Sequence, residues 1–458
     1  MLNKFFSFWQ IFWDATKLDV TNFSYMFLPP YLKVTKTIKV GCPRPGVIVR
    51  IGSFLWRMVQ TFTSLPKSAQ MPLINEGDKL FFVVHRNEYS ALQPVLEYCS
   101  NSRLLGVYEV GEKFPLFWTY IYALCFLPLV IFNYLRESSE MRETYRYVLD
   151  DYLLAYGFYI YARQFLADKQ PEVLVMANDH LMWTRALLNA ARDEQIPTVY
   201  MQHASVTTKF PPLAFDYALL DGMDAAEKYA ICGVSSTKVY LIGIPKFDKY
   251  QKSINASNKV SCVGVCVNPL NTLEDLSSLA EMLNQQIPQL QIVLRPHPAD
   301  SRFASWNTFA ERHGWQFSDG RTESALEFLS STDAIIAGDS NILLEAALMN
   351  VVPLYYDFSG QNMDWYGFQK HGLVNCYQRP NDVVQELKDL LDKKPNIRHR
   401  AKRFCATIDT LYDGRSQYLA SQLIDNIASH TSITGEWQKV EKLNKLDVYH
   451  LIHSTYTI

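Results

Sequence analysis

Short runs of β-branched and aromatic residues alternate with helical stretches along most of this chain, and this alternation limits the fold more than any other feature. Strands that are separated by helices pair in parallel, so the pattern predicts an α/β protein with helices covering parallel sheets. The strands predicted in the first half are Gly46–Ile51, Leu80–Val84, Leu104–Val110, Val173–Ala177, Thr198–Gln202, Asp216–Leu220 and Lys238–Ile242. The main helices predicted there are Met141–Leu166 and Leu181–Gln195.

A polar segment, residues 249–259, interrupts the alternation and is the best candidate for a linker. The strands predicted after it are Ser261–Val267, Gln291–Leu294, Ala334–Ala337 and Val352–Tyr355, again with helices between them. We therefore expect two parallel-sheet domains, residues 1–250 and 260–402, that face a central cleft. Residues 403–458 are expected to form helices that pack back across the domains: a long one over Arg403–His430, and a docking helix that carries Trp437, Val440, Leu443 and Leu446.

Composition excludes several classes of protein. The 458 residues carry 44 Lys and Arg against 46 Asp and Glu, a formal charge of −2 that excludes a strongly basic nucleic-acid binder. Hydrophobic residues make up 48% of the chain, too large a share for a disordered protein. The 8 cysteines show no zinc-ligand spacing, so we expect buried free thiols in a reducing cytosol and no bound metal or cofactor.

Aromatic residues crowd two early segments, Phe5–Trp13 and Phe114–Tyr134. Residues 114–135 carry no charge and are long enough to span a membrane, although Pro115 and Pro128 interrupt them. The segment could be a span, an interfacial or re-entrant segment, or a helix buried in the protein. The first residues could form an interfacial helix or an ordinary packing helix. We expect a cytoplasmic protein at the periphery of the inner face of the cytoplasmic membrane, with residues 114–135 associated with that surface.

Polar residues follow two predicted strands of the first domain. Asp179 and His180 follow Val173–Ala177, and His203 follows Thr198–Gln202. At the carboxyl end of a strand these side chains would face the cleft, where they could take a proton from a hydroxyl group. Asp179 and His203 are therefore the candidate catalytic bases, with capping of the next element as the structural alternative for each.

Two motifs in the second domain suit a phosphate. Arg295 and His297 close a predicted strand as Arg-Pro-His-Pro, which combines a permanent positive charge with a rigid histidine loop. Gly338, Asp339 and Ser340 form a small-residue turn between the next strand and a helix, where backbone N–H groups favour an anion. Glu345, one turn into that helix, could accept hydrogen bonds from a ribose. Together these motifs predict a nucleotide site, although Asp339 or Ser340 could instead be a simple N-cap.

Other signatures are absent or weaker. The sequence has no GxxxxGK[ST], GxGxxG, HExxH or GxSxG motif, and no DxD-type pair for metal-dependent transfer. Residues 243–248, Gly-Ile-Pro-Lys-Phe-Asp, could form a hinge between the domains or touch a ligand. Asp357 and residues 364–367 could meet an acceptor sugar.

The order of these motifs resembles that of bacterial surface-polysaccharide glycosyltransferases of the GT-B architecture. The resemblance covers roughly residues 170–375 and rests on Gln-His at 202–203, G-x-P-K-F-D at 243–248, R-P-H-P at 295–298 and G-D-S-N-x-x-x-E at 338–345. Similar families are the Kdo and sialic-acid transferases of capsule and lipopolysaccharide, and the polyol-phosphate transferases of wall teichoic acid. The resemblance implies two Rossmann-like domains that hold the donor in the second domain and the acceptor in the first.

Individual residues match these families unevenly. The resemblance implies that His297, Gly338, Asp339 and Ser340 contact the donor phosphate. The first-domain histidine of teichoic-acid enzymes is followed by glycine, whereas His203 is followed by Ala204, and Asp221-Gly222 lacks the first acid of the sialyltransferase base motif. UDP-GlcNAc 2-epimerases share the architecture, but residues 355–360 replace their arginine-rich segment, which argues against an epimerase.

The expected activity is therefore an inverting, metal-independent sugar transfer that builds a surface polysaccharide (capsule, lipopolysaccharide or O-antigen). The partners would be a CMP- or UDP-linked sugar donor, a lipid-linked or polysaccharide acceptor and the membrane surface. One alternative is a polyol-phosphate transferase that uses a CDP-polyol. The other is a non-catalytic module that binds polysaccharide or nucleotide, in which Arg295, His297 and Glu345 would not converge on one cleft.

Overall fold

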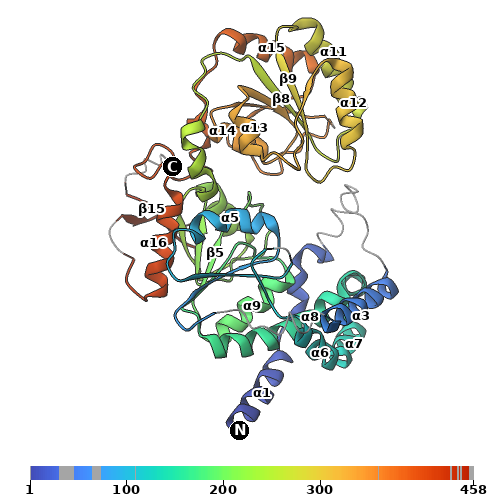
Figure 1. The fold of residues 1–458 in the computed structure, drawn as a ribbon, viewed down its shortest axis with the longest axis vertical. Coiled ribbons are helices and arrows are strands. Elements are labelled where there is room, and N and C mark those ends of the chain that lie inside the picture. The colour runs from blue at the N-terminus through green and yellow to red at the C-terminus, as the bar shows by residue number, and fades with distance from the viewer. Residues whose placement is uncertain are drawn as a thin grey trace.

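Two parallel β-sheets, each covered by helices, form the body of the protein (Figure 1). The computed structural model describes residues 2–29, 46–63, 74–108, 110–358, 360–433, 436–440, 443 and 446–452. Within them the first sheet has nine strands in the order β14-β15-β7-β6-β5-β4-β1-β2-β3, and the second has six in the order β10-β9-β8-β11-β12-β13. Every pairing is parallel except that of β14 with β15. The α/β prediction is confirmed.

The first sheet consists of β1 (Lys79–Val83), β2 (Ser102–Gly106), β3 (Glu112–Lys113), β4 (Val173–Met176), β5 (Thr198–Met201), β6 (Tyr217–Leu220), β7 (Lys238–Leu241), β14 (Trp437–Lys439) and β15 (Asp447–Leu451). The second consists of β8 (Cys262–Val267), β9 (Gln291–Pro296), β10 (Gln316–Phe317), β11 (Ala334–Ala337), β12 (Val352–Tyr356) and β13 (Asn375–Tyr377). The central strands are buried on both faces, as expected for continuous apolar runs between layers of helices.

The helices of the first half are α1 (Leu2–Ala15), η1 (Val20–Phe27), α3 (Val47–Thr63), α5 (Arg86–Leu96), α6 (Phe117–Cys125), α7 (Leu127–Arg136), α8 (Ser139–Lys169), α9 (Met182–Asp193), α10 (Met223–Cys232) and η2 (Pro245–Ser253). Those of the second half are α11 (Leu273–Gln286), α12 (Phe303–His313), α13 (Ala325–Ser330), α14 (Ile342–Leu348), α15 (Pro380–Asp392), η3 (Arg398–Ala401) and α16 (Ser416–Ala428). Helix α16 returns to pack on the first sheet (Figure 1).

The strand predicted at Gly46–Ile51 is wrong, because these residues begin helix α3. Their β-branched side chains favour a strand locally, but the penalty for such residues in a helix is only a few tenths of a kcal/mol each. The aromatic contact between Phe54 of α3 and Tyr120 of α6, with ring centroids 5.1 Å apart, fixes the helix against the protein. Tertiary packing therefore overrides the local preference.

The uncharged segment at residues 114–135 forms two helices, α6 and α7, bent by 53°. Pro128 lies in the first turn of α7, where a proline fits best, so it starts a new helix after the break at Phe126. Helix α6 packs closely on α8 at Gly157, where a Cβ atom would overlap the carbonyl oxygen of Thr119. Among the described helices none is long and apolar enough alone to cross a bilayer; α6 and α7 meet that test only together.

The C-terminal helices are predicted only in part. Within Arg403–His430 only α16 is a long helix, because Asp409 and Gly414 adopt left-handed backbone conformations that end any helix before it. The predicted docking helix at Trp437–Leu446 is wrong: β14 and β15 form a hairpin that extends the first sheet beside β7.

The seven cysteines among the described residues are free thiols, and Cys99, Cys262, Cys266 and Cys405 are buried as expected. Cys125 is exposed. Cys42 lies outside the described residues.

Candidate functional site

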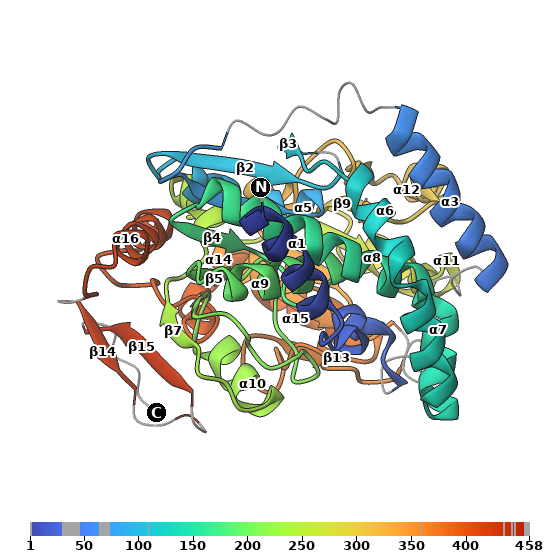
Figure 2. The same ribbon diagram turned by 90° about the horizontal axis from the view of Figure 1, so that it is seen from below.

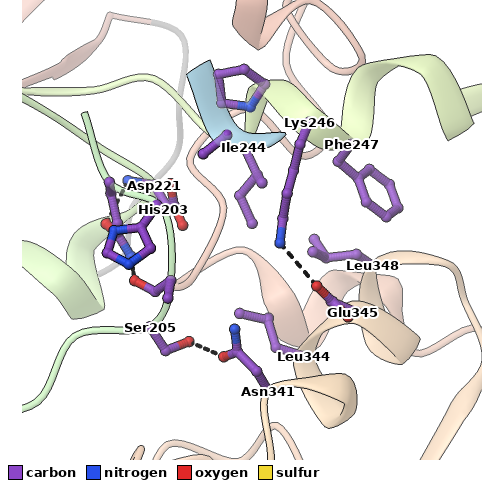
Figure 3. A pocket seen from close by; sticks show the side chains of 14 residues that line it. His203, Ser205, Asp221, Ile244, Lys246, Phe247, Asn341, Leu344, Glu345 and Leu348 are labelled. Carbon is purple, nitrogen blue, oxygen red and sulfur yellow. Dashed lines mark hydrogen bonds and ion pairs between the residues drawn. The ribbon is translucent and has the colours of Figure 1, made fainter. Parts of the chain in front are cut away.

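The carboxyl ends of the two sheets supply the residues of two neighbouring hollows. The first, called here the interdomain pocket, is lined by residues of both halves of the chain and measures about 20 Å³, room for about one water molecule (Figure 3). His203, Ser205, Asp221 and Lys246 line it from the first half, and Asn341, Leu344, Glu345 and Leu348 line it from helix α14 and the turn before it.

The second hollow, called here the second-sheet cavity, measures about 310 Å³ and lies at the ends of β8, β9 and β11. Arg295, His297, Gly338, Ser340 and Glu345, all singled out in the sequence, line it. Asn341 and Glu345 line both hollows, so the two adjoin at α14. The residues expected to hold a nucleotide therefore converge on one cavity beside the interdomain pocket.

His297 is held in a defined orientation at this cavity. Its backbone N–H donates to the carbonyl oxygen of Val267 (2.8 Å), and its Nδ1 accepts a hydrogen bond from the backbone N–H of Ala299 (3.1 Å). Burial lowers the pKa of His297, and Arg295 lowers it further. Because Nδ1 accepts, the neutral ring carries its proton on Nε2, which leaves an N–H donor for an anionic ligand.

Arg295 is buried and already paired within the protein. Its Nη1 donates to Ser318 Oγ (2.6 Å) and Glu323 Oε2 (3.2 Å), and its Nη2 donates to the Glu323 carbonyl oxygen (2.7 Å). The guanidinium also lies over the ring of Phe328. The permanent positive charge expected from Arg295 is therefore offset in large part by Glu323.

Only part of the small-residue turn at residues 338–340 lines the second-sheet cavity. Gly338 and Ser340 line the second-sheet cavity, and a Cβ atom on Gly338 would meet no protein atom closer than 3.6 Å. Asp339, by contrast, is absent from the lining; its carboxylate accepts a hydrogen bond from the backbone N–H of Trp365 (2.5 Å). Burial raises the pKa of Asp339 to about 6. The structure thus places Asp339 against the loop at 364–367 instead of in the cavity.

Glu345 is paired with Lys246 across the two halves of the chain, with Oε1 and Nζ 2.9 Å apart (Figure 3). This pair raises the pKa of Lys246 and keeps it charged. The G-x-P-K-F-D segment therefore lies at the domain junction and lines the interdomain pocket, which leaves both predicted roles, hinge and ligand contact, open. Oε1 of Glu345 accepts from Lys246, and Oε2 keeps its full capacity to accept from a ribose hydroxyl.

His203 lines the interdomain pocket, and its Nδ1 atom is buried with no hydrogen-bond partner. Burial lowers the pKa of His203 to about 4, and nearby His180 acts in the same direction. The ring is therefore neutral near pH 7 and its Nδ1 lone pair is unpaired, but a pKa of about 4 makes it a weak base in this arrangement.

Asp179 is buried with both carboxylate oxygens engaged. Oδ1 lies 2.8 Å from Nδ1 of His180, and Oδ2 accepts a hydrogen bond from the hydroxyl of Tyr229 (2.7 Å). These hydrogen bonds and the charge of His180 outweigh burial and lower the pKa of Asp179. The geometry does not suit Asp179 as the base itself; when Nδ1–H of a neutral His180 donates to Asp179, the acceptor of that ring is Nε2.

Asp221 does not match the sialyltransferase base motif, because Leu220 stands before it in place of an acid. In the structure it follows β6 directly and lines the interdomain pocket close to His203 (Figure 3). Burial raises the pKa of Asp221 well above its ordinary value, and Lys246 opposes this shift. The sequence feature that could have identified Asp221 as a pocket residue is its position: a carboxylate directly after an apolar strand.

Among the described residues, no group of three or more His, Cys, Asp or Glu side chains is arranged to hold a metal ion. The weaker sequence candidate Asp357 lies after β12 and accepts a hydrogen bond from the backbone N–H of Asn362 (2.6 Å), so it shapes its own loop.

Comparisons with known proteins identify the fold. No protein-family model and no curated protein matches the sequence. Among solved structures, the UDP-GlcNAc 2-epimerase from Neisseria meningitidis bound to UDP-GlcNAc aligns with a TM-score of 0.52 and 13% identity over 76% of this chain and 100% of that chain. The putative UDP-N-acetylglucosamine 2-epimerase from Listeria monocytogenes aligns with a TM-score of 0.50 and 12% identity over 79% of this chain and 99% of that chain.

The wall teichoic acid polymerase TagF aligns with a TM-score of 0.48 and 13% identity over 83% of this chain and 98% of that chain. At the identities of the two epimerases the similarity shows the fold alone, and that fold is GT-B, two facing parallel-sheet domains.

Proposed function

We propose that this protein is an inverting glycosyltransferase that takes a sugar from a nucleotide-activated donor held in the second-sheet cavity. The observation that carries the proposal is the convergence of Arg295, His297 and Glu345 on one cavity that adjoins a pocket lined by an unpaired histidine. A non-catalytic binding module would need no such base beside the cavity. The Neisseria protein of the same fold holds UDP-GlcNAc, which supports a nucleotide sugar as the ligand class.

The proposed reaction is a single displacement. His203 takes the proton of an acceptor hydroxyl at the interdomain pocket, and the oxygen attacks the anomeric carbon as the bond to the nucleoside phosphate breaks. Nε2–H of His297 and the hydroxyl of Ser340 donate to the phosphate oxygens and stabilise the charge that grows on them. The acceptor would be a lipid-linked or polysaccharide hydroxyl at the cytoplasmic membrane face, and the product a bacterial surface polysaccharide.

A second candidate base is His180, because Asp179 orients it as the aspartate of a catalytic triad orients its histidine. The two histidines can be separated by substitution. His203→Ala is expected to reduce kcat by roughly a hundredfold or more with little change in donor binding. If His180→Ala has that effect and His203→Ala does not, the base is His180.

The proposal is tested by thermal denaturation with CMP, CDP, UDP, GDP and their sugar or polyol conjugates. A bound nucleotide raises the midpoint of unfolding, by about 2.7 kcal/mol of stabilisation at a hundredfold excess over Kd. His297→Ala should abolish the shift, whereas His399→Ala, an exposed histidine on η3, should retain it. If none of the panel raises the midpoint of the unsubstituted protein, the proposed function is wrong; a shift with the CDP-polyols alone points to polyol-phosphate transfer.

A further inference from the structure

Helix α3 presents a stripe of apolar side chains to solvent, whereas Arg50 and Phe54 are buried against the protein. Along one face lie Ile48, Leu55, Trp56, Val59 and Phe62, spaced at three, four and seven residues; we call this set the α3 stripe. Their exposed fractions run from 45% for Leu55 to 87% for Ile48. On the opposite face Arg50 and Phe54 are only 6% and 4% exposed. This is the reverse of a helix that covers the core of a water-soluble domain.

The inward face is fixed by specific contacts, so α3 cannot simply rotate to hide its stripe. Arg50 forms a buried ion pair with Asp150 of α8. Phe54 packs edge-on against Tyr120 of α6, and at the end of the helix the ring of Phe62 lies 5.6 Å from that of Phe117. Breaking the Arg50 pair would leave an uncompensated buried charge, which opposes any rotation.

The apolar surface continues beyond α3. Helix α6 joins it to α1, because Phe12 of α1 packs on Tyr122 and Phe126 with ring centroids 5.6 and 5.8 Å apart. Exposed indole rings lie at Trp9 and Trp13 on α1 and at Trp118 on α6, and exposed apolar side chains continue along α7. Figure 2 shows α3, α6 and α7 along one side of the molecule.

The charges on this surface indicate which occupant covers it. Helices α3, α6 and α7 contain no acidic residue and three arginines, Arg50, Arg57 and Arg136. Arg57 and Arg136 are exposed, and Arg136 lies 5.0 Å from the ring centre of Phe132. Apolar side chains, tryptophans and cations without acids suit the interface of an anionic bilayer, where acyl chains, carbonyl groups and phosphates lie at successive depths. A second copy of this surface would bring the arginines of the two copies together without acids to pair them.

From this geometry we infer that α3 is an interfacial membrane helix. The α3 stripe enters the acyl region of an anionic lipid leaflet, and Arg136 contacts phosphate groups. The inference makes the proposed location at the membrane specific. The sequence predicts that residues 114–135 contact the membrane, but α6 packs on α8 there. The main membrane contact is instead assigned to α3, whose first residues the sequence predicts as a strand. The inference rests on the proposed function only for the choice of a membrane as the partner. Lipid binding itself does not depend on catalytic turnover and can be measured separately.

The test is co-sedimentation of the purified full chain with vesicles made of equal parts phosphatidylcholine and phosphatidylglycerol. Trp56→Glu and Val59→Glu are each expected to weaken binding by about tenfold or more. Leu411→Glu, a matched change at an exposed apolar residue outside this surface, should bind as the unsubstituted protein does. Arg136→Gln should weaken binding on the order of fivefold, and only to the anionic vesicles.

Two outcomes overturn the inference. One is equal vesicle binding by Trp56→Glu and the unsubstituted protein. The other is a stable dimer in lipid-free solution, measured by light scattering, that Trp56→Glu converts to a monomer, since the stripe would then be covered by a second copy. The thermal midpoint of each variant with the nucleotide that binds best shows that the fold and cavity are intact. Loss of lipid binding is thereby distinguished from failure of the proposed reaction.

Discussion

At the scale of single residues, the buried Nδ1 atom of His203 links stability to pH. The pKa of this histidine falls from its ordinary value of 6.5 to about 4 in the folded protein, so between these values the unfolded chain binds the extra proton. The contribution of the neutral His203 to the free energy of unfolding is therefore fully present above pH 6.5 and is lost as the pH falls toward 4. The loss should amount to about 3 kcal/mol by pH 4.

In the variant His203→Asn this loss should be absent. Urea unfolding at a series of pH values in that window would show a shallower fall in the free energy of unfolding than in the unsubstituted protein. Parallel pH profiles for the two proteins would contradict the buried, neutral state of His203.

Gly338 provides a test of the cavity that does not disturb the fold. A Cβ atom there meets only side-chain atoms at 3.6 Å and the backbone is not left-handed, so Gly338→Ala should fold and gain up to about 1 kcal/mol of stability. The methyl group points to the region where the proposed phosphate approaches the backbone, so nucleotide affinity should fall by about tenfold or more. Calorimetric titration checks this, and unchanged affinity would place the phosphate elsewhere.

The residue types of the site could be predicted from the sequence better than their roles. Polar residues after apolar strands correctly marked His203, Arg295 and His297 as lining residues, because parallel strands bring their carboxyl ends to one edge. The partners of these residues could not be predicted. Glu323, which pairs with Arg295, lies just before helix α13, and no local pattern contains its contact with β9; the contact between Lys246 and Glu345 depends on how two domains meet.

At the scale of helices and strands, the contact of α6 with α8 depends on one glycine. A Cβ atom at Gly157 would overlap the carbonyl oxygen of Thr119 and lie 2.7 Å from the backbone nitrogen of Ala123, so Gly157→Ala must push the two helices apart. We expect a loss of about 1–3 kcal/mol in the free energy of unfolding, the range typical of overpacking.

A matched substitution controls for helix propensity. Gly52 of α3 has no atom within 4 Å of a Cβ position, so Gly52→Ala should raise stability by about 0.5–1 kcal/mol. Both variants exchange glycine for alanine inside a helix, and denaturant unfolding compares them directly. Equal effects would mean that α6 and α8 are not in the close contact described.

Strands whose local hydrophobic pattern matches their burial in the structure could be predicted from the sequence. Elements that depend on contacts with residues far along the chain could not. Strands β4 to β9 and β11 match the predicted runs within a few residues, because buried parallel strands need continuous apolar residues. Helix α3 and the β14–β15 hairpin depend on contacts far along the chain. Tyr240 of β7, for example, stacks on Tyr449 with ring centroids 4.8 Å apart, and no local pattern contains that contact.

At the scale of the whole molecule, the two halves of the chain close over the interdomain pocket through a small set of polar contacts. Lys246 pairs with Glu345 (2.9 Å), the hydroxyl of Ser205 donates to Asn341 Oδ1 (2.5 Å), and Lys228 donates to the carbonyl oxygen of Tyr366 (2.6 Å). A pocket of about 20 Å³ holds one water molecule and excludes a sugar. An acceptor can therefore reach His203 only after the halves separate.

These contacts are weak enough to open during a catalytic cycle. The Lys246–Glu345 pair is partly exposed, with 30% and 16% of the two side chains accessible, so it contributes about 0.5–1 kcal/mol. The double variant Lys246→Ala/Ser205→Ala should therefore shift the equilibrium toward separated domains by about fivefold or more. Small-angle X-ray scattering should show a larger radius of gyration than for the unsubstituted protein. Lys402→Ala breaks an exposed pair with Asp409 away from the pocket and should leave the scattering curve unchanged. If the double variant also leaves it unchanged, these contacts do not hold the domains together, and entry of the acceptor must follow another route.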